Sequence, residues 1–430
     1  MTDIVPFSSE SDILFRWISS ENTENCIPTI RESDASKKIF TQLFSDIETS
    51  VQTISQLKRK KGIRFYNVKY SNISNKNDVP KPDTFNMSSI PKHIRDYINT
   101  DTKGTITYTT TIKNKKFTAI FVVENIDMYE HIGIYNKYFD RMVTWLNIGF
   151  NYSSGKCGND LTVYLYFSPF EKKLPDNFTD IIGQDHANTA FTYTCPSDKS
   201  EIVIFRQEEW FKVFIHETFH LLALDFSGMN ADDICKEKMS DVFNIKSDFK
   251  LFETYTETWA VIIHTCFCSY FCLEGNKDLS EFLKSTKFLL RFEVMFKIFQ
   301  MHKILSFMGL TYDMFLDKSM ETKIAQDTLY HEKTNIFAYH IASTIALCKY
   351  IQFIEWCDIN NMNFLQFKKS IVNVNSFCDS IISWHNDRHT LRTINKVTKE
   401  GCFKKMINNA NNKENKWIRD TMRMTICEIN

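Results

Sequence analysis

Glycine and proline are scarce in this sequence. Its 430 residues include 11 Gly and 8 Pro, which together make about 4% of the chain against a usual share of roughly 12%. These residues supply most tight turns and interrupt helices. Their scarcity excludes a fold built from many short, sharply connected strands and favours long helices.

Net charge is also absent, because 52 Lys and Arg residues balance 52 Asp and Glu residues. Broad binding to nucleic acid requires a concentrated positive field. Two short basic clusters, at residues 58–61 and 113–116, fit solvated turns better than such a surface. We therefore expect no nucleic-acid partner.

No hydrophobic run is long enough to suggest a membrane span. The longest covers residues 259–273, fewer than the roughly 20 that a transmembrane helix needs, and residues 1–6 lack the pattern of a secretion signal. The 12 cysteines form no CxxC pair, and Cys266, Cys268 and Cys272 share one apolar stretch. That distribution favours buried free thiols, so we expect a soluble, cytoplasmic protein in a reducing compartment, with no membrane partner.

The hydrophobic periodicity predicts strands first and helices afterwards. We expect a hairpin from residues 105–112 and 117–123, and further strands at 161–167, 189–194 and 201–206. Helices are predicted within 1–60, over 127–148, and almost continuously from 207 to at least 379, with a linker or long loop at 71–92. This order indicates an α+β fold, a small mixed or antiparallel sheet followed by a largely helical region.

The chain also carries an HExxH motif, formed by His216, Glu217 and His220 within the apolar, helix-forming run 210–224. Residues four apart lie one turn apart on the same face of a helix, so both imidazoles can point at one metal ion. Glu217 projects about 100° away around the helix axis, where it can reach a water molecule without binding the metal itself. The motif predicts a zinc-dependent hydrolase with His216 and His220 as metal ligands.

A catalytic zinc ion needs a third protein ligand. The pattern HExxHxxGxxH is excluded, because Ala223 and Phe226 occupy its glycine and histidine positions. Glu253 and Glu257 instead lie four residues apart on an otherwise apolar helical stretch. Two like charges on one buried face repel each other unless a cation or protons offset them, so either glutamate is a candidate ligand.

The layout of edge strand, HExxH helix and later glutamate-bearing helix resembles that of the gluzincin metallopeptidases. Residues 257–260, Glu-Thr-Trp-Ala, are similar to the E-G-[FL]-A signature of several gluzincin families, whereas Glu253 and Glu257 together are similar to an ExxxD variant in which the first carboxylate binds the metal. We prefer Glu257 as ligand, because the small Ala260 allows close helix packing, and the other glutamate would support a ligand. Residues 202–217 also resemble metallopeptidase sequences of large DNA viruses, a likeness that implies a viral origin and a place in the host cytoplasm or virion.

The resemblance implies that residues 121–430 form a zincin-like domain that binds Zn²⁺ and cleaves a protein or peptide substrate, with Glu217 as general base. Residues 1–120, a helical segment plus the hairpin, would then be a recognition or lid module. The oxyanion formed during hydrolysis needs a second donor, for which Tyr339 and His340 are the leading candidates. Weaker alternatives are Tyr330 with His331, Arg423 as a further donor, and His186 and Asn188 as residues lining the cleft.

Two other functions fit the same residues. One is a structural or virion-packaged protein that retains its metal site as a stabilising element. The other is a metal-dependent hydrolase of a non-peptide amide, which the motif alone does not distinguish from a peptidase. The presence of Glu217 favours an enzyme, because a purely structural site has no use for a general base. The sequence leaves open whether Glu253 or Glu257 is the ligand, and also the oligomeric state.

Overall fold

The computed structural model describes residues 6–20, 32–61, 65–124, 128–240, 242–275, 277–399 and 413–430. These residues form two compact units. The sheet unit comprises residues 42–171 and 188–224, and the helical unit comprises 1–41, 172–187 and 225–430. Each unit is described separately below.

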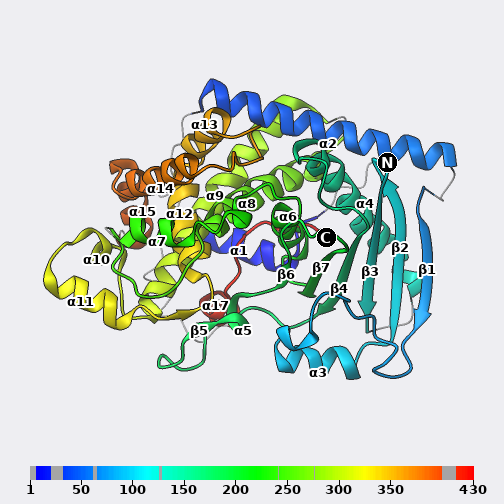
Figure 1. Cartoon of the computed structure of the whole chain (residues 1–430), viewed down its shortest axis with the longest axis horizontal. Coiled ribbons are helices and arrows are strands. Elements are labelled where there is room, and N and C mark those ends of the chain that lie inside the picture. Colours follow the sequence, from blue (N-terminus) through cyan, green and yellow to red (C-terminus); the bar gives the residue numbers. More distant parts are fainter. Residues whose placement is uncertain are drawn as a thin grey trace. The chain divides into compact units, whose positions relative to one another are not determined.

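The sheet unit is built on six strands (Figure 1). They are β1 (Asn67–Asn72), β2 (Gly104–Ile112), β3 (Lys115–Val123), β4 (Leu161–Ser168), β6 (Ala190–Thr192) and β7 (Ser200–Arg206). Their spatial order is β1-β2-β3-β4-β7-β6, with β3–β4 and β4–β7 parallel and the other pairs antiparallel. The predicted hairpin is confirmed as β2–β3, and its turn residues Lys113 and Asn114 both have positive φ, as a two-residue hairpin turn of the favoured twist requires.

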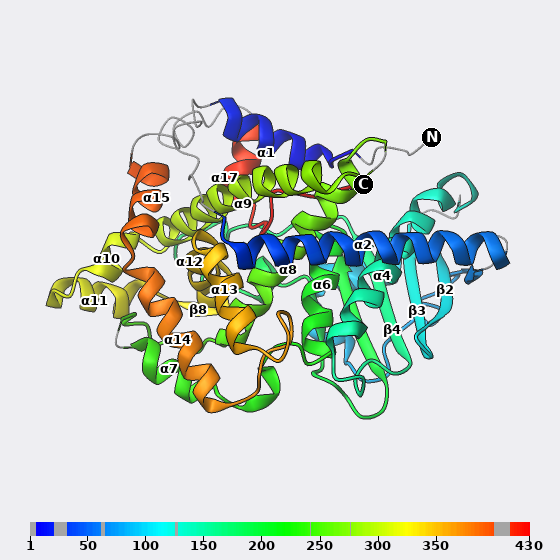
Figure 2. The same ribbon diagram turned by 90° about the horizontal axis from the view of Figure 1, so that it is seen from above.

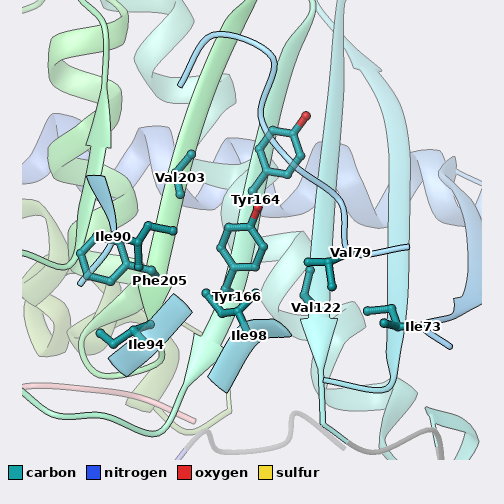
Figure 3. Close-up of a cluster of buried hydrophobic side chains, with 10 residues drawn as sticks. All are labelled: Ile73, Val79, Ile90, Ile94, Ile98, Val122, Tyr164, Tyr166, Val203 and Phe205. Carbon is teal, nitrogen blue, oxygen red and sulfur yellow. The ribbon is translucent and has the colours of Figure 1, made fainter. Parts of the chain in front are cut away.

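Helices cover both faces of this sheet. On one face, α3 (Lys92–Thr100) packs its isoleucines against alternate side chains of β4 and β7, and Figure 3 shows the resulting cluster. Its buried members are Ile73, Val79, Ile90, Ile94, Ile98, Val122, Tyr164, Tyr166, Val203 and Phe205. On the other face, Phe139 of α4 (Met128–Tyr152) stacks on Tyr108 of β2 and Phe117 of β3. Side chains that alternate along a strand point to opposite faces of the sheet, and here helices cover both of these faces.

The predicted linker at 71–92 is a packed loop. Ile73, Val79 and Ile90 within it are buried. The carboxylate of Glu201 on β7 accepts hydrogen bonds from the backbone N–H groups of Asp83 (3.0 Å) and Thr84 (2.8 Å). Because the loop is fixed to the sheet in this way, it does not separate two domains.

The helical unit consists almost entirely of helices, as the scarcity of glycine and proline predicted (Figure 2). Its helices are α1 (Ser9–Ser20), α5 (Gln184–Ala187), η4 (Ser227–Met229), α7 (Asp232–Ser240), α8 (Leu251–Cys272), α9 (Leu279–Phe307), α10 (Tyr312–Leu316), α11 (Met320–Leu329), η5 (Phe337–Ala342), α12 (Ser343–Cys348), α13 (Tyr350–Asn360), α14 (Ile371–His385), α15 (Arg388–Lys399) and α17 (Lys413–Asp420). A two-stranded parallel sheet pairs β5 (Ile182–Gly183) with β8 (Glu332–Lys333). Helix α2 (Asp34–Lys61) contributes residues to both units.

Helix α9 organises the helical unit by holding residues 421–429, which are almost wholly buried without forming a helix. Glu293 accepts hydrogen bonds from the backbone N–H groups of Ile426 and Cys427. Gln300 donates to the carbonyl of Arg423, and Lys303 donates to that of Thr421. These polar side chains satisfy backbone groups that burial would otherwise leave unpaired.

The α+β fold class is confirmed, with a mixed sheet and a helical C-terminal region. The structure nevertheless divides the chain differently from the expected boundary at residue 120. Strand β3, the second strand of the hairpin, pairs with β4, so the hairpin belongs to the same sheet as the strand before the HExxH helix. Sequence patterns alone do not reveal this pairing, because it joins segments about 40 residues apart.

Among the described residues, no helix is both long and apolar enough to cross a membrane. The expectation that the cysteines are free thiols needs one correction, because Cys157 and Cys195 in the sheet unit form a disulfide. Eight other cysteines of the described residues carry thiol side chains, and seven of these are buried. Cys26 and Cys402 lie outside the described residues.

The disulfide generates a stability prediction. It closes a sequence separation of 38 residues, and a cross-link of that length stabilises a fold by about 4 kcal/mol, chiefly by restricting the unfolded chain. The double variant Cys157→Ser/Cys195→Ser should lose roughly that free energy of unfolding in guanidinium titrations. Reductant should lower the stability of the wild type by a similar amount and leave the double variant unchanged. A wild type indifferent to reductant would contradict the disulfide.

Candidate metal centre

The HExxH segment forms helix α6 (Trp210–Leu221), all of whose residues are buried. The helix follows directly on β7, and the connection is fixed by Arg206, the last residue of that strand. The buried guanidinium of Arg206 donates hydrogen bonds to the carbonyls of Asn188 (3.0 Å) and Phe170 (2.9 Å). The predicted sequence of strand and HExxH helix is therefore confirmed.

The orientation of α6 is set by Trp145 of α4. The Trp145 indole N–H donates to the hydroxyl of Thr218, and its ring stacks on Phe219 with centroids 5.9 Å apart. Thr218 and Phe219 are the two middle residues of the HExxH motif. Because both face α4, the two histidines point to another side of the helix.

His216 and His220 lie one helical turn apart, as their spacing predicted. Their Nε2 atoms are 3.1 Å apart. Zinc–nitrogen bonds of about 2.0–2.1 Å in a tetrahedral site place two ligand nitrogens roughly 3.3 Å from each other. The separation of the two nitrogens is therefore close to that of two zinc ligands, and it also fits a hydrogen bond between the two rings.

Glu253 supplies the third group. One ligand atom from each of His216, His220 and Glu253 lies within 4.8 Å of the other two. All three residues are buried, with 7–8% of their surface exposed. This buried His-His-Glu group is compatible with a bound metal ion.

Glu257, the preferred ligand in the sequence analysis, is held elsewhere. Its carboxylate is completely buried and lies 2.9 Å from the ammonium of Lys297 on α9. A carboxylate already paired with a buried lysine has less need of a metal to offset its charge. The arrangement therefore favours Glu253 over Glu257 as the third ligand.

Two contacts inside the helical unit fix the glutamate-bearing turn of α8. The side-chain amide of Asn335 donates to Glu253 Oε1 at 3.5 Å, and the hydroxyl of Thr254 donates to the carbonyl of Ala338 at 3.2 Å. Such support for ligand side chains is typical of metal centres. Neither Asn335 nor Lys297 was singled out from the sequence, although a lysine within the apolar stretch 292–299 was a usable signal of a buried ion pair.

The predicted oxyanion donors Tyr339 and His340 lie on η5, which is a π-helix. Here the N–H of Ser343 bonds to the carbonyl of Ala338. The carbonyl of Tyr339 accepts instead from the Ser343 hydroxyl and from the Lys297 ammonium, the latter at 3.1 Å. π-Helical turns often occur at functional sites. The lysine that pairs with Glu257 thus also stabilises the irregular turn that carries Tyr339.

His340 is fully buried, and neither of its ring nitrogens has a hydrogen-bond partner among the described residues. Burial, reinforced by the nearby Lys297 ammonium, holds the pKa of His340 well below its usual value. Tyr339 is half-buried beside the Met422 and Met424 side chains. Their roles as oxyanion donors stay predictions.

The weaker candidates occupy separate places. The Tyr330 hydroxyl donates to Glu332 and the Arg423 guanidinium to Glu428, whereas His331 is exposed. His186 accepts the backbone N–H of Gly183, and the carbonyl of Asn188 accepts from Arg206. Among the described residues, the group of potential metal ligands contains none of these side chains.

The chain matches no model of a known protein family, and no curated protein or solved structure is significantly similar to it. The likeness to gluzincins thus depends on the quoted motifs and on the ligand group.

Helix α6 ends where the excluded HExxHxxGxxH pattern would place glycine. Ala223 has a φ of 52°, and the N–H of Leu224 bonds to the carbonyl of Phe219 while that of Ala223 bonds to His220. This is a Schellman ending, which usually has glycine at the left-handed position.

Ala223→Gly should therefore stabilise the protein by up to about 1 kcal/mol, because a left-handed backbone costs alanine roughly that much. Chemical denaturation measures the change. Ala260→Gly is the matched control and should destabilise by about 1 kcal/mol or more, because Ala260 lies within the regular helix α8. Equal destabilisation by both substitutions would contradict the positive φ at residue 223.

The buried ion pair generates a second prediction. Lys297→Met should lower the free energy of unfolding by about 3–5 kcal/mol, because it leaves the Glu257 carboxylate buried without its partner. The double variant Lys297→Met/Glu257→Gln removes both charges and should recover much of that loss in urea titrations. If the double variant were as unstable as the sum of its single variants, the two residues would not act as a pair.

Proposed function

We propose that the protein is a zinc-dependent peptidase in which Glu217 is the general base. The observation that carries the proposal is the paired geometry of His216 and His220, whose Nε2 atoms lie 3.1 Å apart on one helix. Glu217 follows His216 directly and is also buried. An isolated pair of buried histidines does not need a neighbouring carboxylate, whereas a hydrolytic site does.

The donor set supports zinc. Two imidazole nitrogens and one carboxylate are the ligands of several catalytic zinc sites, in which a fourth position is left for water or substrate. His216, His220 and Glu253 would hold the ion, and the side-chain amide of Asn335 lies 3.5 Å from the carboxylate of Glu253. The described residues add no fourth histidine, cysteine or carboxylate to the group, and this agrees with a catalytic rather than a closed structural site.

The reaction needs a base, an orienting framework and a place for the substrate. A zinc ion held by these ligands would supply a bound water of lowered pKa and a Lewis acid for the scissile carbonyl. The Glu217 carboxylate would accept the proton of that water and return it to the leaving amine. Trp145 and Arg206 keep α6, and hence Glu217, in a fixed orientation.

The sheet supplies a surface that suits a peptide substrate. Strand β6 stands at the end of the strand order, beside β7, and its residues 190–192 are partly exposed. An edge strand can bind an extended peptide as an additional strand through backbone hydrogen bonds. This feature favours a peptide over a small non-peptide amide as substrate.

Glu217→Gln should retain bound zinc and lose peptide hydrolysis, because the amide no longer accepts a proton; general-base catalysis typically contributes about 10²–10⁴-fold. His216→Ala and Glu253→Gln should each weaken zinc affinity more than about 100-fold, since loss of a supporting residue alone costs about 10–100-fold. Metal analysis and turnover of a fluorogenic peptide library measure both effects. The control Lys297→Met/Glu257→Gln should keep its zinc.

Three results would contradict parts of this proposal. Unchanged turnover in Glu217→Gln would remove its role as base. If Lys297→Met/Glu257→Gln lost its zinc while Glu253→Gln kept it, Glu257 rather than Glu253 would be the third ligand. If the zinc-loaded wild type cleaved neither the peptide library nor denatured casein, the metal site would be structural and not that of a peptidase.

A further inference from the structure

The helical unit contains a cavity of about 640 Å³ that none of the candidate zinc ligands lines. Its walls come from residues 173–178 and from three helices, α1, the C-terminal half of α9, and α17. These three helices lie together in Figure 2. Pockets that bind small organic molecules usually have volumes of about 300–1,000 Å³. The cavity is therefore large enough for such a ligand.

Aromatic rings form much of its lining. Trp17 and Phe299 are buried and meet edge to face, with centroids 4.6 Å apart. Phe307 contacts Phe178 at 5.5 Å, and Phe178 is 82% exposed. An isolated exposed aromatic needs no explanation, but one that continues a buried aromatic lining is typical of a binding surface.

The charged side chains around the cavity are predominantly positive. Four basic residues line it (Lys173, Lys303, Lys416 and Arg419) against the two acids Asp176 and Asp420, a formal excess of two positive charges among the described lining residues. His302 adds little charge at neutral pH, because burial lowers its pKa. A ligand with a negative charge would complement this excess.

One of these cations connects the polar and apolar parts of the lining. Lys303 is buried, with 9% of its surface exposed. Its ammonium lies 5.1 Å from the centroid of the Phe299 ring. The same ammonium donates to the carbonyls of Ile418 and Thr421, which hold it in place. A fixed cation thus lies at the edge of an aromatic surface, where the head of an amphiphile would meet its apolar body.

We propose that this cavity binds a small anionic amphiphile, a molecule with one carboxylate or phosphate head and an aliphatic or aromatic body. The aromatic rings would bury the body, and Lys303 and Lys416 would attract the head. Arg419, whose guanidinium also pairs with Asp420 at 3.1 Å, would add to that attraction. A cationic amphiphile of the same size would meet the positive excess and bind more weakly. This site is independent of the proposed zinc chemistry.

Isothermal titration calorimetry of the full chain tests the proposal, with dodecanoate and dodecyl phosphate as probes below their micelle concentrations. We expect saturable binding with one site and at least tenfold weaker binding of dodecyltrimethylammonium. Lys416→Glu/Arg419→Glu should weaken dodecanoate binding about tenfold, because it replaces two positive charges beside the head group with negative ones. Both side chains are exposed, so the fold should tolerate the change.

Two further variants complete the test. Phe178→Ala should weaken binding of both anionic probes several-fold, because it removes an exposed aromatic surface without opening the core. Lys76→Glu/Lys81→Glu is the matched control, with the same charge change at exposed positions of the sheet unit, and should bind normally. Preference for one probe identifies the head group.

Three outcomes would overturn the proposal: no saturable binding of either anionic probe, equal binding of the cationic probe, or charge-reversal variants that bind like the control. Binding to phosphatidylglycerol vesicles without binding of the monomeric probes would also overturn it, because the surface would then recognise a membrane. The zinc ligands take no part in these measurements, so failure here leaves the proposed peptidase activity untouched.

Discussion

The buried ion pair between Lys297 and Glu257 determines which glutamate of α8 is available to bind a metal ion. Each charge has lost nearly all contact with water, which is tolerable only because the two are adjacent and further hydrogen bonds surround them. The pair also supplies a donor for the Tyr339 carbonyl, which the π-helical turn leaves without its usual partner. By committing Glu257 to this role, the pair leaves Glu253, one turn earlier on α8, as the carboxylate available to a metal.

This arrangement departs from both gluzincin patterns that the sequence resembles. In the ExxxD variant the second carboxylate supports a ligand histidine, whereas here the residue in that position pairs with a lysine from α9. The support of Glu253 comes instead from Asn335, 82 residues further along the chain. Glu253, in the position of the variant's first carboxylate, groups with the two histidines, whereas Glu257, in the position of the second, pairs with a lysine. The preference for Glu257 relied on the small Ala260, which bears only on how closely two helices can pack. It carries no information about which of the two glutamates pairs with a lysine distant in the sequence.

Features set by local sequence were predictable, and features set by distant partners were not. The strands at 161–167 and 201–206, the β2–β3 hairpin and the paired histidines follow from periodicity and spacing within a few residues, and each is confirmed. The hairpin's place in the same sheet as β7, the anchoring of loop 73–91 by Glu201, and the Cys157–Cys195 disulfide depend on pairings between separated segments. Lys297 belongs to both groups, because its position in an apolar helix signals burial but its partner lies 40 residues earlier.

The origin of the ligands links metal binding to folding. His216 and His220 come from one turn of α6, so formation of that helix is sufficient to bring their nitrogens together. Glu253 takes its position only when α8 is packed against residues 335–342, because Asn335 contacts the Glu253 carboxylate and the Thr254 hydroxyl bonds to the carbonyl of Ala338 in η5. An unfolded chain offers the histidines but not the third ligand in place, so a metal ion that requires all three binds the folded state preferentially and stabilises it. A zinc site of this composition would therefore contribute to the stability of the protein as well as to its chemistry. Glu217 distinguishes the two contributions, because it lies on the same helix as the histidines but is not a ligand: it would serve catalysis without adding to metal binding.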